Sequence, residues 1–308
     1  MAAPLNRTLT LTPARQQELL ARCARWREGM TPAQLAGQVF CADSFELLPR
    51  LPDAFVDLLV VDPPYNLSKR YGQSSFARMG QPEYEDYTRR WLAAVRHTLK
   101  PTATVYVCCD WRSSLVIGRV LEESLTLRNR ITWQREKGRG AAANYKNAME
   151  DIWFATADAK TYTFHADAVR LRRRVLAPYR AEGQPKDWQQ TPQGRFRDTA
   201  PSNFWDDITV PYWSMPENTP HPAQKPEKLL AKLILASSDP GDLVLDPFGG
   251  VGSTAVAAQK LGRRFLLLER EPQYCALAQA RLERAQGDPA IQGYEDGVFW
   301  ERNSRPRG

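Results

Sequence analysis

Short runs of consecutive apolar residues recur along the chain and alternate with longer segments in which apolar residues lie three or four positions apart. An apolar run bounded by a turn signal is typical of a strand buried on both faces, and the longer segments are typical of amphipathic helices. The pattern therefore predicts an α/β fold. The expected strands cover 39–41, 56–61, 102–109, 128–133, 151–156, 243–246 and 264–269, and the main expected helices cover 13–26, 82–99, 113–125, 221–237, 253–260 and 272–286.

The regular alternation breaks down between residues 157 and 216, where basic and aromatic residues are interleaved. Such a mixture suits phosphate contacts and base stacking, although a solvated charged surface over a small aromatic core is the alternative. Because the segment interrupts a regular α/β pattern, we predict that it contacts nucleic acid. The basic candidates, including those in two polar loops, are Lys69, Arg70, Arg139, Arg172, Arg173, Arg174, Arg195 and Arg197.

A sharp change follows the apolar run at 56–61, where the sequence continues Asp62-Pro63-Pro64-Tyr65. Neither proline can donate a backbone N–H, so the strand must end in a rigid corner. Open α/β sheets bind their ligands at the carboxyl ends of strands. The corner offers a carboxylate, a carbonyl without a ladder partner and a flat ring, which suit a flat substrate that carries an amine.

A second unit, residues 243–269, reads as a strand, a glycine-rich turn, a helix and a strand that ends in Glu269. Glycines let the backbone approach a ligand closely, and an acid at the end of the next strand can accept hydrogen bonds from ribose hydroxyls. The turn is neither a GxGxxG dinucleotide motif nor a Walker loop. A nucleoside without a pyrophosphate fits better. S-adenosylmethionine is such a ligand, with Asp246 near its amino-acid part and Glu269 on its ribose.

Together, the two motifs resemble the signature motifs of DNA methyltransferases that modify exocyclic amines. The catalytic motif precedes the cofactor loop, which is the order of the beta class of that family. The resemblance extends over about 38–285 and includes HisProAlaGlnLysPro at 221–226 and AlaAspSerPhe at 42–45. It implies a circularly permuted, Rossmann-like methyltransferase sheet with a smaller inserted target-recognition region. It also implies that the cofactor S-adenosylmethionine is bound by Asp43, Lys225, Pro226, Asp246, Pro247, Phe248, Gly249, Gly250, Gly252, Ser253, Thr254 and Glu269.

The chemistry of the corner is consistent with this resemblance. The lone pair of an exocyclic amine is delocalised into the base, so the nitrogen is a poor nucleophile. Hydrogen bonds from its two N–H groups to Asp62 and to the Pro63 carbonyl would favour a pyramidal nitrogen, while Tyr65 would stack on the base. The catalytic candidates are Asp62, Pro63, Pro64 and Tyr65.

The resemblance also divides the chain. We expect a helical appendage over 1–37, the catalytic half over 38–156, the target-recognition region over 157–216, the cofactor-binding half over 217–286 and a poorly ordered tail over 287–308. Within the tail, Phe299 and Trp300 are candidates to dock back. The polar loop over 66–81 is either a lid or an ordinary surface loop. Asp43 could cap the following helix instead of binding the cofactor, and Lys225 could be an exposed residue at a helix start.

The composition adds limits to this prediction. The chain has 308 residues and a net charge of +7, which favours a polyanionic partner, here double-stranded DNA. Its five cysteines lack metal-ligand spacing, so no metal site is predicted, and reduced thiols indicate a cytoplasmic protein. No run is long enough to span a membrane. A separate cognate restriction endonuclease and a dimeric state are compatible with the family.

The sequence leaves the target base open. Asp at the start of the catalytic motif is commoner in adenine-N6 enzymes of the family, whereas the blocks at 105–114 and 133–141 resemble cytosine-N4 members. On these blocks we predict cytosine-N4 ahead of adenine-N6. Methylation of RNA or of protein glutamine, where the motif commonly begins with Asn, is disfavoured by Asp62 and by the basic insert. A non-catalytic DNA-binding protein is disfavoured because both motifs are intact.

Overall fold

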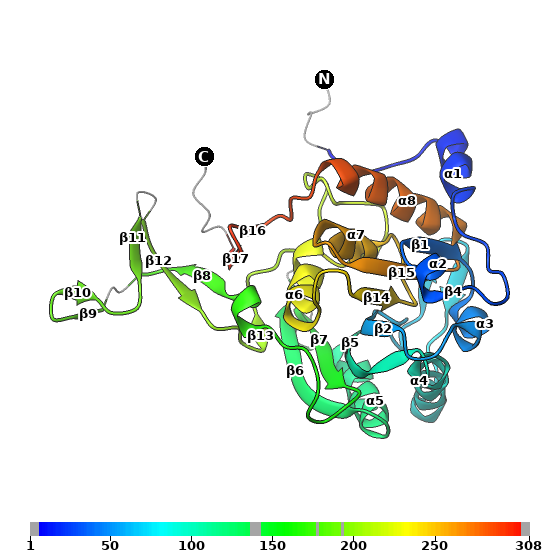
Figure 1. Ribbon diagram of the computed structural model, residues 1–308, viewed down its shortest axis with the longest axis horizontal. Coiled ribbons are helices and arrows are strands. Elements are labelled where there is room, and N and C mark those ends of the chain that lie inside the picture. Colours follow the sequence, from blue (N-terminus) through cyan, green and yellow to red (C-terminus); the bar gives the residue numbers. More distant parts are fainter. Residues whose placement is uncertain (1–5, 136–142, 177–178, 192–193, 303–308) are drawn as a thin grey trace.

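The structure is a computed structural model that describes residues 6–135, 143–176, 179–191 and 194–302. Figure 1 shows an α/β body from which a narrow arm of strands projects. The predicted DNA contact Arg139 lies outside the described residues.

An eight-stranded sheet forms the centre of the body, in the order β1-β15-β14-β2-β5-β7-β6-β13. The first five strands of that order are parallel, and β7 is antiparallel to both β5 and β6. The strands are β1 (Gln38–Cys41), β15 (Arg264–Glu269), β14 (Leu243–Asp246), β2 (Val56–Val61), β5 (Leu99–Cys109), β7 (Met149–Thr156), β6 (Thr126–Gln134) and β13 (Phe204–Trp205).

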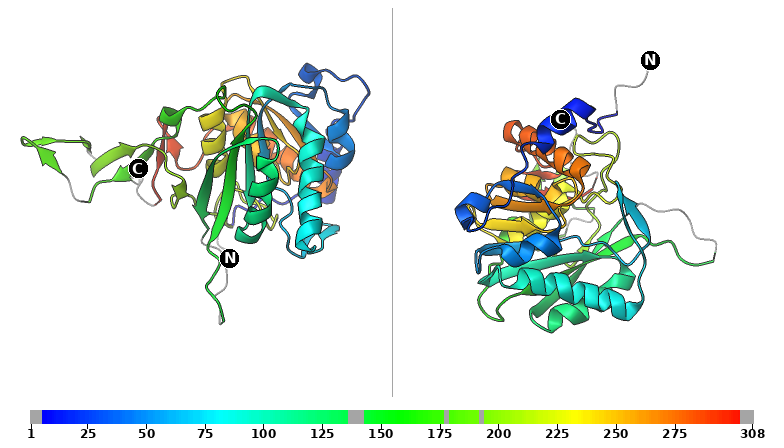
Figure 2. Two further views of the ribbon diagram at one scale, coloured as in Figure 1. Left: turned by 90° about the horizontal axis from the view of Figure 1, so that it is seen from below. Right: turned by 90° about the vertical axis from the view of Figure 1, so that its right-hand side faces the viewer.

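Helices cover both faces of this sheet, as Figures 1 and 2 show. Successive side chains of a strand point to opposite faces, so Leu59 and Val61 of β2 pack toward α4 and α5, while Leu58 and Val60 pack toward α6 and α7. This double burial explains why β2 is apolar at nearly every position. The helices are α4 (Gln81–Arg96), α5 (Trp111–Glu122), α6 (Glu227–Ser237), α7 (Ser253–Lys260) and α8 (Pro272–Gly287).

The catalytic and cofactor strands are neighbours in the sheet although they are far apart in the sequence. Leu58 and Leu59 of β2 pair with Val244 and Leu245 of β14. Because the pairing is parallel, the corner after β2 and the glycine-rich turn after β14 emerge at the same edge. The predicted fold class, a permuted Rossmann-like sheet with a smaller insert, is confirmed.

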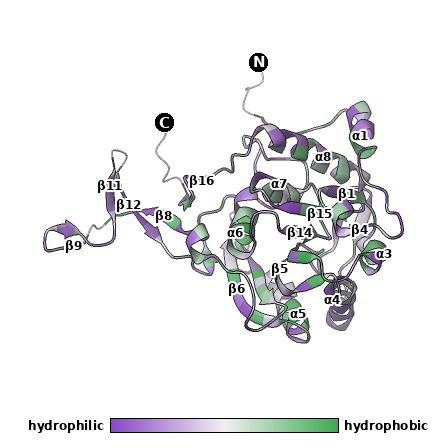
Figure 3. Ribbon diagram, viewed as in Figure 1, coloured by the Kyte–Doolittle hydropathy of each residue, from purple (hydrophilic) through white to green (hydrophobic). Residues whose placement is uncertain are grey.

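The projecting arm contains a second sheet that the sequence pattern did not predict. Its order is β11-β12-β8-β17-β16, and a two-stranded hairpin, β9 with β10, lies beyond it. Figure 3 shows mainly hydrophilic residues along the outer part of the arm, which explains why a clear strand period is hard to find there. The strands are β8 (Leu171–Arg174), β9 (Arg180–Ala181), β10 (Gln184–Pro185), β11 (Gln189–Thr191), β12 (Gly194–Thr199), β16 (Tyr294–Glu295) and β17 (Val298–Trp300).

Residues 294–300 of the tail are ordered rather than loose, and Phe299 and Trp300 dock back as the sequence predicted. Phe299 pairs with Leu171 of β8 and is fully buried against Ala231 and Leu235 of α6. Burial of an aromatic side chain of this size favours docking by about 2 kcal/mol. The C-terminal strand therefore connects the arm to the body.

Short elements complete the fold. The N-terminal helix α1 (Pro13–Leu20) packs on α8 through Leu19 and is shorter than the predicted 13–26. The polar loop after the catalytic corner contains a hairpin of β3 (Lys69–Tyr71) and β4 (Ser74–Phe76). The remaining elements are α2 (Pro32–Leu35), α3 (Ser44–Leu47), η1 (Leu48–Arg50) and η2 (Ala166–Val169). Within the described ranges, no helix is long and apolar enough to cross a membrane.

Candidate active site

A cavity of about 240 Å³ opens at the carboxyl ends of β2 and β14. All four residues of the catalytic corner line it, together with part of the glycine-rich turn. One region is apolar and another is acidic. The lining includes Phe45, Phe76, Tyr87 and Phe248 in the apolar region, and Asp43, Glu269 and Glu271 in the acidic region.

The corner itself is held in place by neighbouring elements. The hydroxyl of Tyr84 on α4 donates to the Pro64 carbonyl at 3.1 Å, and the backbone N–H of Asn66 donates to the Ser113 hydroxyl at 3.2 Å. Asp62 is 22% exposed at its side chain, so its carboxylate can reach a ligand in the cavity. The corner is thus a fixed support and not a flexible loop.

Lys225 contacts the carboxylate of Asp62, a contact that the sequence did not reveal. Its Nζ lies 2.6 Å from Asp62 Oδ2, 3.0 Å from the Tyr65 hydroxyl and 3.4 Å from Glu150 Oε2. Burial acts to lower the pKa of Lys225, but the charges of Asp62 and Glu150 raise it above its ordinary value. Lys225 is therefore a buried ammonium, and the interpretation as an exposed helix-start residue is wrong.

The Tyr65 hydroxyl lies at the centre of this cluster. It is 2.9 Å from Asp62 Oδ1 and 3.1 Å from Glu150 Oε2. Burial, followed by the charges of Asp62 and Glu150, raises the pKa of Tyr65 well above its ordinary value, so the hydroxyl stays neutral. The Lys225 ammonium lies 5.3 Å from the centre of the Tyr65 ring.

Sequence reasoning missed Glu150 and Arg135, which complete the cluster. The Glu150 side chain is 4% exposed, and its second oxygen forms an ion pair with the Arg135 guanidinium. Both residues line the cavity. The sequence did offer one indication of Glu150: an acid at the start of an apolar strand is buried, and a buried charge requires a partner.

The glycine-rich turn leaves no room for side chains at two positions. A Cβ on Gly249 would overlap Leu267, and a Cβ on Gly252 would lie 2.8 Å from the Ala278 Cβ at a backbone φ of +77°. Gly250 has a φ of +51°, and its N–H donates to Glu269 Oε2 at 2.8 Å. The turn is therefore close-packed from β15 to α8.

Glu269 ends β15 in the acidic region of the cavity. Its Oε1 accepts from the Glu271 N–H at 2.7 Å, and burial raises its pKa even though the Glu271 and Gly250 N–H groups act in the opposite direction. Phe248 and Pro247 also line the cavity. The backbone of Pro247 is held by the Ser44 hydroxyl.

Other predicted cofactor residues act inside the turn. Asp246 accepts from the Phe248 N–H at 3.0 Å and from the Thr254 hydroxyl at 2.5 Å, and burial raises its pKa to about 7. The Ser253 hydroxyl accepts from Arg281 at 2.8 Å. Their cofactor contacts stay predictions, as does that of Pro226, which precedes α6 as its buried N-cap. Each contributes to the shape of the site.

Asp43 combines its two predicted roles. Its Oδ1 accepts from the Phe45 N–H at 2.8 Å and so caps α3, and the residue also lines the cavity. A cap at this position leaves the second carboxylate oxygen of Asp43 for a ligand, so its cofactor contact stays a prediction.

The β3–β4 hairpin lies beside the cavity and is attached to α8. Glu271 accepts from the Gln73 N–H at 3.0 Å and from the Ser74 hydroxyl. Tyr71 stacks on His221 with ring centres 6.3 Å apart, and burial lowers the pKa of His221 to about 3. For residues 66–81, a lid and an ordinary surface loop both stay open as predictions.

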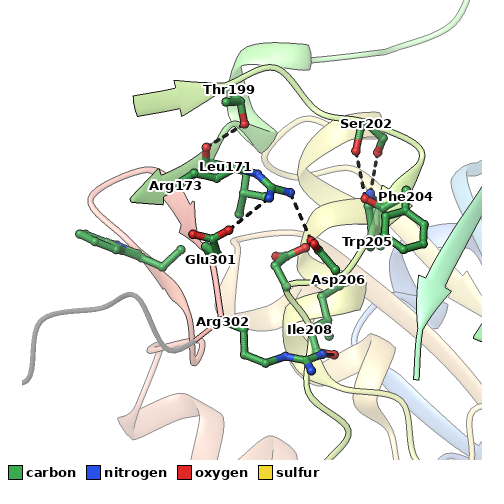
Figure 4. Close-up of polar contacts among 12 residues, drawn as sticks. Leu171, Arg173, Thr199, Ser202, Phe204, Trp205, Asp206, Ile208, Glu301 and Arg302 are labelled. Carbon is green, nitrogen blue, oxygen red and sulfur yellow. Dashed lines mark hydrogen bonds and ion pairs between the residues drawn. The ribbon is translucent and has the colours of Figure 1, made fainter. Parts of the chain in front are cut away.

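Among the predicted DNA contacts, two half-buried arginines form ion pairs within the protein, four are exposed, and Lys69 lies at the cavity. Arg172 forms a bidentate pair with Asp198 at 2.7 Å, and Arg173 bridges Asp206 at 3.2 Å and Glu301 at 3.1 Å, as Figure 4 shows for Arg173. The side chains of both arginines are therefore engaged in ion pairs within the protein: Arg172 with a residue of the neighbouring strand β12, and Arg173 with Glu301 of the C-terminal segment and with Asp206. The exposed members are Arg70, Arg174, Arg195 and Arg197, and Lys69 lines the cavity.

The sheet order and a cavity shared by two strand ends are those of a Rossmann-like α/β fold with a ligand site at its strand ends. A family model described as DNA methylase matches residues 56–280. The chain belongs to this DNA methylase family of amino-methyltransferases.

Two relatives support the assignment. The type II methyltransferase M.HpaI of Haemophilus parainfluenzae is 31% identical over 80% of this chain and 74% of its own. The DNA adenine methyltransferase YhdJ of Escherichia coli (strain K12) is 31% identical over 84% of this chain and 88% of its own.

Solved structures share the fold. The M1.HpyAVI–SAM complex has a TM-score of 0.55 at 22% identity and covers 80% of this chain and 98% of its own. The cytosine-N4-specific PvuII DNA methyltransferase has a TM-score of 0.60 at 20% identity and covers 82% of this chain and 90% of its own.

Proposed function

We propose that this chain transfers a methyl group from S-adenosylmethionine to an exocyclic amine of a base at a specific site in double-stranded DNA. One observation carries the proposal: the Asp62 corner and the glycine-rich turn line one cavity. Their strands are paired in parallel, so both motifs face the same volume.

The residues of the cavity fit S-adenosylmethionine. Gly250 brings the backbone to the cavity wall, Glu269 offers a carboxylate suited to ribose hydroxyls, and Phe248 and Phe45 offer an apolar surface for a flat base. When bound, the cofactor supplies a methyl group activated by a positively charged sulfur. The acidic residues of the cavity suit that positive charge.

The catalytic corner prepares the amine. Asp62 and the Pro63 carbonyl accept its two N–H bonds, which withdraws the nitrogen lone pair from the ring and directs it toward the methyl group. Tyr65 supplies the stacking surface. The methylated nitrogen is cationic and acidic, and its proton passes to Asp62 or to water. A duplex base reaches the corner only after it is flipped out, at a cost of a few kcal/mol.

For the target we propose the N4 amine of cytosine. The resemblance of residues 105–114 and 133–141 to cytosine-N4 members supports this choice. The described residues of these blocks include the end of β5, the start of α5, the end of β6 and the cavity residues Asp110 and Arg135. Asp110 and Arg135 therefore lie beside the cavity in which we place the acceptor base.

Adenine-N6 is the second candidate, and two observations favour it. The catalytic motif begins with Asp62, and a relative with 31% identity is named a DNA adenine methyltransferase. Both acceptors are exocyclic amines, so the chemistry of the corner is the same for either base.

The exposed arginines of the arm, Arg174, Arg195 and Arg197, support a role of this region in DNA binding. The cognate endonuclease, the dimeric state and the cytoplasmic location stay predictions from the sequence.

Nucleoside analysis tests the proposal. DNA incubated with the protein and S-adenosylmethionine is digested, and the nucleosides are identified by mass spectrometry. N4-methylcytosine is expected. N6-methyladenine alone would replace the target with the second candidate, and unmodified DNA across all sequences tested would refute the methyl transfer itself.

A further inference from the structure

Glu150 lies inside the candidate active site, although it belongs to neither motif that defines the site. It is the second residue of β7 and is 3% exposed. One carboxylate oxygen faces the Tyr65 hydroxyl and the Lys225 ammonium, and the other is paired with Arg135. A buried carboxylate with this many partners requires an explanation beyond packing.

The Tyr65 hydroxyl has one proton and two carboxylates within reach. It is 2.9 Å from Asp62 and 3.1 Å from Glu150, while Lys225 donates to it from 3.0 Å. The hydroxyl can donate to only one carboxylate at a time. When it donates to Glu150, an Asp62 oxygen is released from that hydrogen bond.

Glu150 also balances the charges of the cluster. Two carboxylates, Asp62 and Glu150, face two cations, Lys225 and Arg135. Without Glu150, the Lys225 ammonium and the Tyr65 hydroxyl would both act on Asp62 alone. A carboxylate that already carries these interactions is a weaker acceptor for another N–H group.

We propose that Glu150 is a positioning residue for methyl transfer, an inference that rests on the proposed function. It accepts the Tyr65 hydrogen bond and shares the Lys225 ammonium, so that Asp62 keeps an oxygen available for the N–H of the base amine. Glu150 acts through Tyr65 and Lys225. Its loss therefore lowers kcat more than it raises KM.

The test compares Glu150→Gln, Glu150→Ala and Tyr65→Phe, singly and as double variants, by steady-state methyl transfer to DNA. Glu150→Ala is expected to lower kcat by about 10- to 100-fold, the effect of one lost charged hydrogen bond. The isosteric Glu150→Gln keeps an oxygen for the Tyr65 hydroxyl and is expected to retain more activity. In the Tyr65→Phe background, both changes are expected to have a much smaller effect on kcat.

Asp151→Asn is the matched control. Asp151 is the next residue of β7 and is equally buried, but its carboxylate accepts from the Thr132 hydroxyl at 3.0 Å on the other face of the sheet. Its kcat is expected to match that of the unchanged protein. Binding of S-adenosylmethionine by calorimetry and the unfolding midpoint identify any variant that fails to fold, and Glu150→Gln then carries the test.

The outcomes separate the two proposals. If the unchanged protein methylates DNA, Asp62→Ala does not, and folded Glu150 variants keep full kcat, only the role of Glu150 is overturned. Effects of Glu150 and Tyr65 that simply add would also overturn it. If the unchanged protein transfers no methyl group to DNA, the proposed function fails, and the role of Glu150 fails with it.

Discussion

The ammonium of Lys225 lies 2.6 Å from the carboxylate of Asp62, although 163 positions separate the two residues. Lys225 precedes α6, in the predicted cofactor-binding half, and Asp62 follows β2, in the predicted catalytic half. This ion pair joins the two predicted halves of the sheet at the candidate active site. A residue expected to serve the cofactor therefore pairs with the carboxylate of the predicted catalytic corner.

Replacement of Lys225 tests this connection. Lys225→Met removes a buried cation and leaves the buried Glu150 carboxylate beside the partly exposed Asp62 carboxylate without it, so the free energy of unfolding is expected to fall by about 3 kcal/mol. Denaturant unfolding at neutral pH measures this loss. As a control, Lys100→Met removes a half-exposed lysine that pairs with Asp57, and it should cost less than about 1 kcal/mol. Equal losses in the two variants would contradict a special role for the buried pair.

His221 gives the stability of the protein a pH dependence. Burial, and then the charge of Lys225, lowers the pKa of His221 to about 3. In the unfolded chain the His221 imidazole takes up a proton near its ordinary pKa of 6.5, whereas in the folded protein it stays neutral down to about pH 3. The contribution of the neutral His221 to stability is therefore lost as the pH falls from about 6.5 toward 3. Between pH 7.5 and pH 5, the free energy of unfolding of the unchanged protein should fall by about 2 kcal/mol more than that of His221→Gln. A difference that does not change with pH would contradict the lowered pKa.

The glycine-rich turn has no room for the alanine side chain that Gly252→Ala would introduce. Gly252→Ala places a Cβ 2.8 Å from the Ala278 Cβ and at a φ of +77°, so we expect a loss of stability of about 3 kcal/mol and weaker binding of S-adenosylmethionine. Gly287→Ala is the control, because a Cβ there would meet no atom of the described residues within 4 Å. Thermal unfolding and calorimetric titration measure both effects. Full cofactor affinity in Gly252→Ala would contradict the close packing of the turn.

The exposed arginines of the arm should be detected through the salt dependence of DNA binding. Arg195 contacts Gln190 and Arg197 pairs with Asp187, both at the surface, so Arg195→Ala and Arg197→Ala should fold normally. Each arginine that contacts a phosphate should reduce the slope of log K against log salt by about 1. Arg172→Ala should instead destabilise the second sheet, because its partner Asp198 is in β12. Unchanged slopes in both exposed-site variants would exclude these arginines as phosphate contacts.

The strands and corners of the body could be predicted because burial on both faces produces unambiguous apolar runs. The run at 56–61 and the one before Asp246 are of this kind, and each ends at a turn residue that marks the ligand edge. Local sequence was therefore enough to predict the strand corner and the glycine-rich turn that line the cavity.

The rest of the site depends on contacts between distant parts of the chain. Glu150 and Arg135 reach the corner only because β6 and β7 pair beside β5, and the spacing of residues does not encode that arrangement. The strands of the arm are short and polar, and β17 joins them from the far end of the sequence. No local period marks such strands.

The most direct test of the account is methyl transfer in Asp62→Ala under single-turnover conditions. S-adenosylmethionine labelled in its methyl group is mixed with DNA and excess protein, and label in DNA is followed over time for the unchanged protein and the variant. The account predicts that Asp62→Ala still binds the cofactor but transfers label at least about 100-fold more slowly, because the amine loses its principal acceptor. Equal rates of labelling by the two proteins would contradict the assignment of Asp62 as the residue that activates the amine.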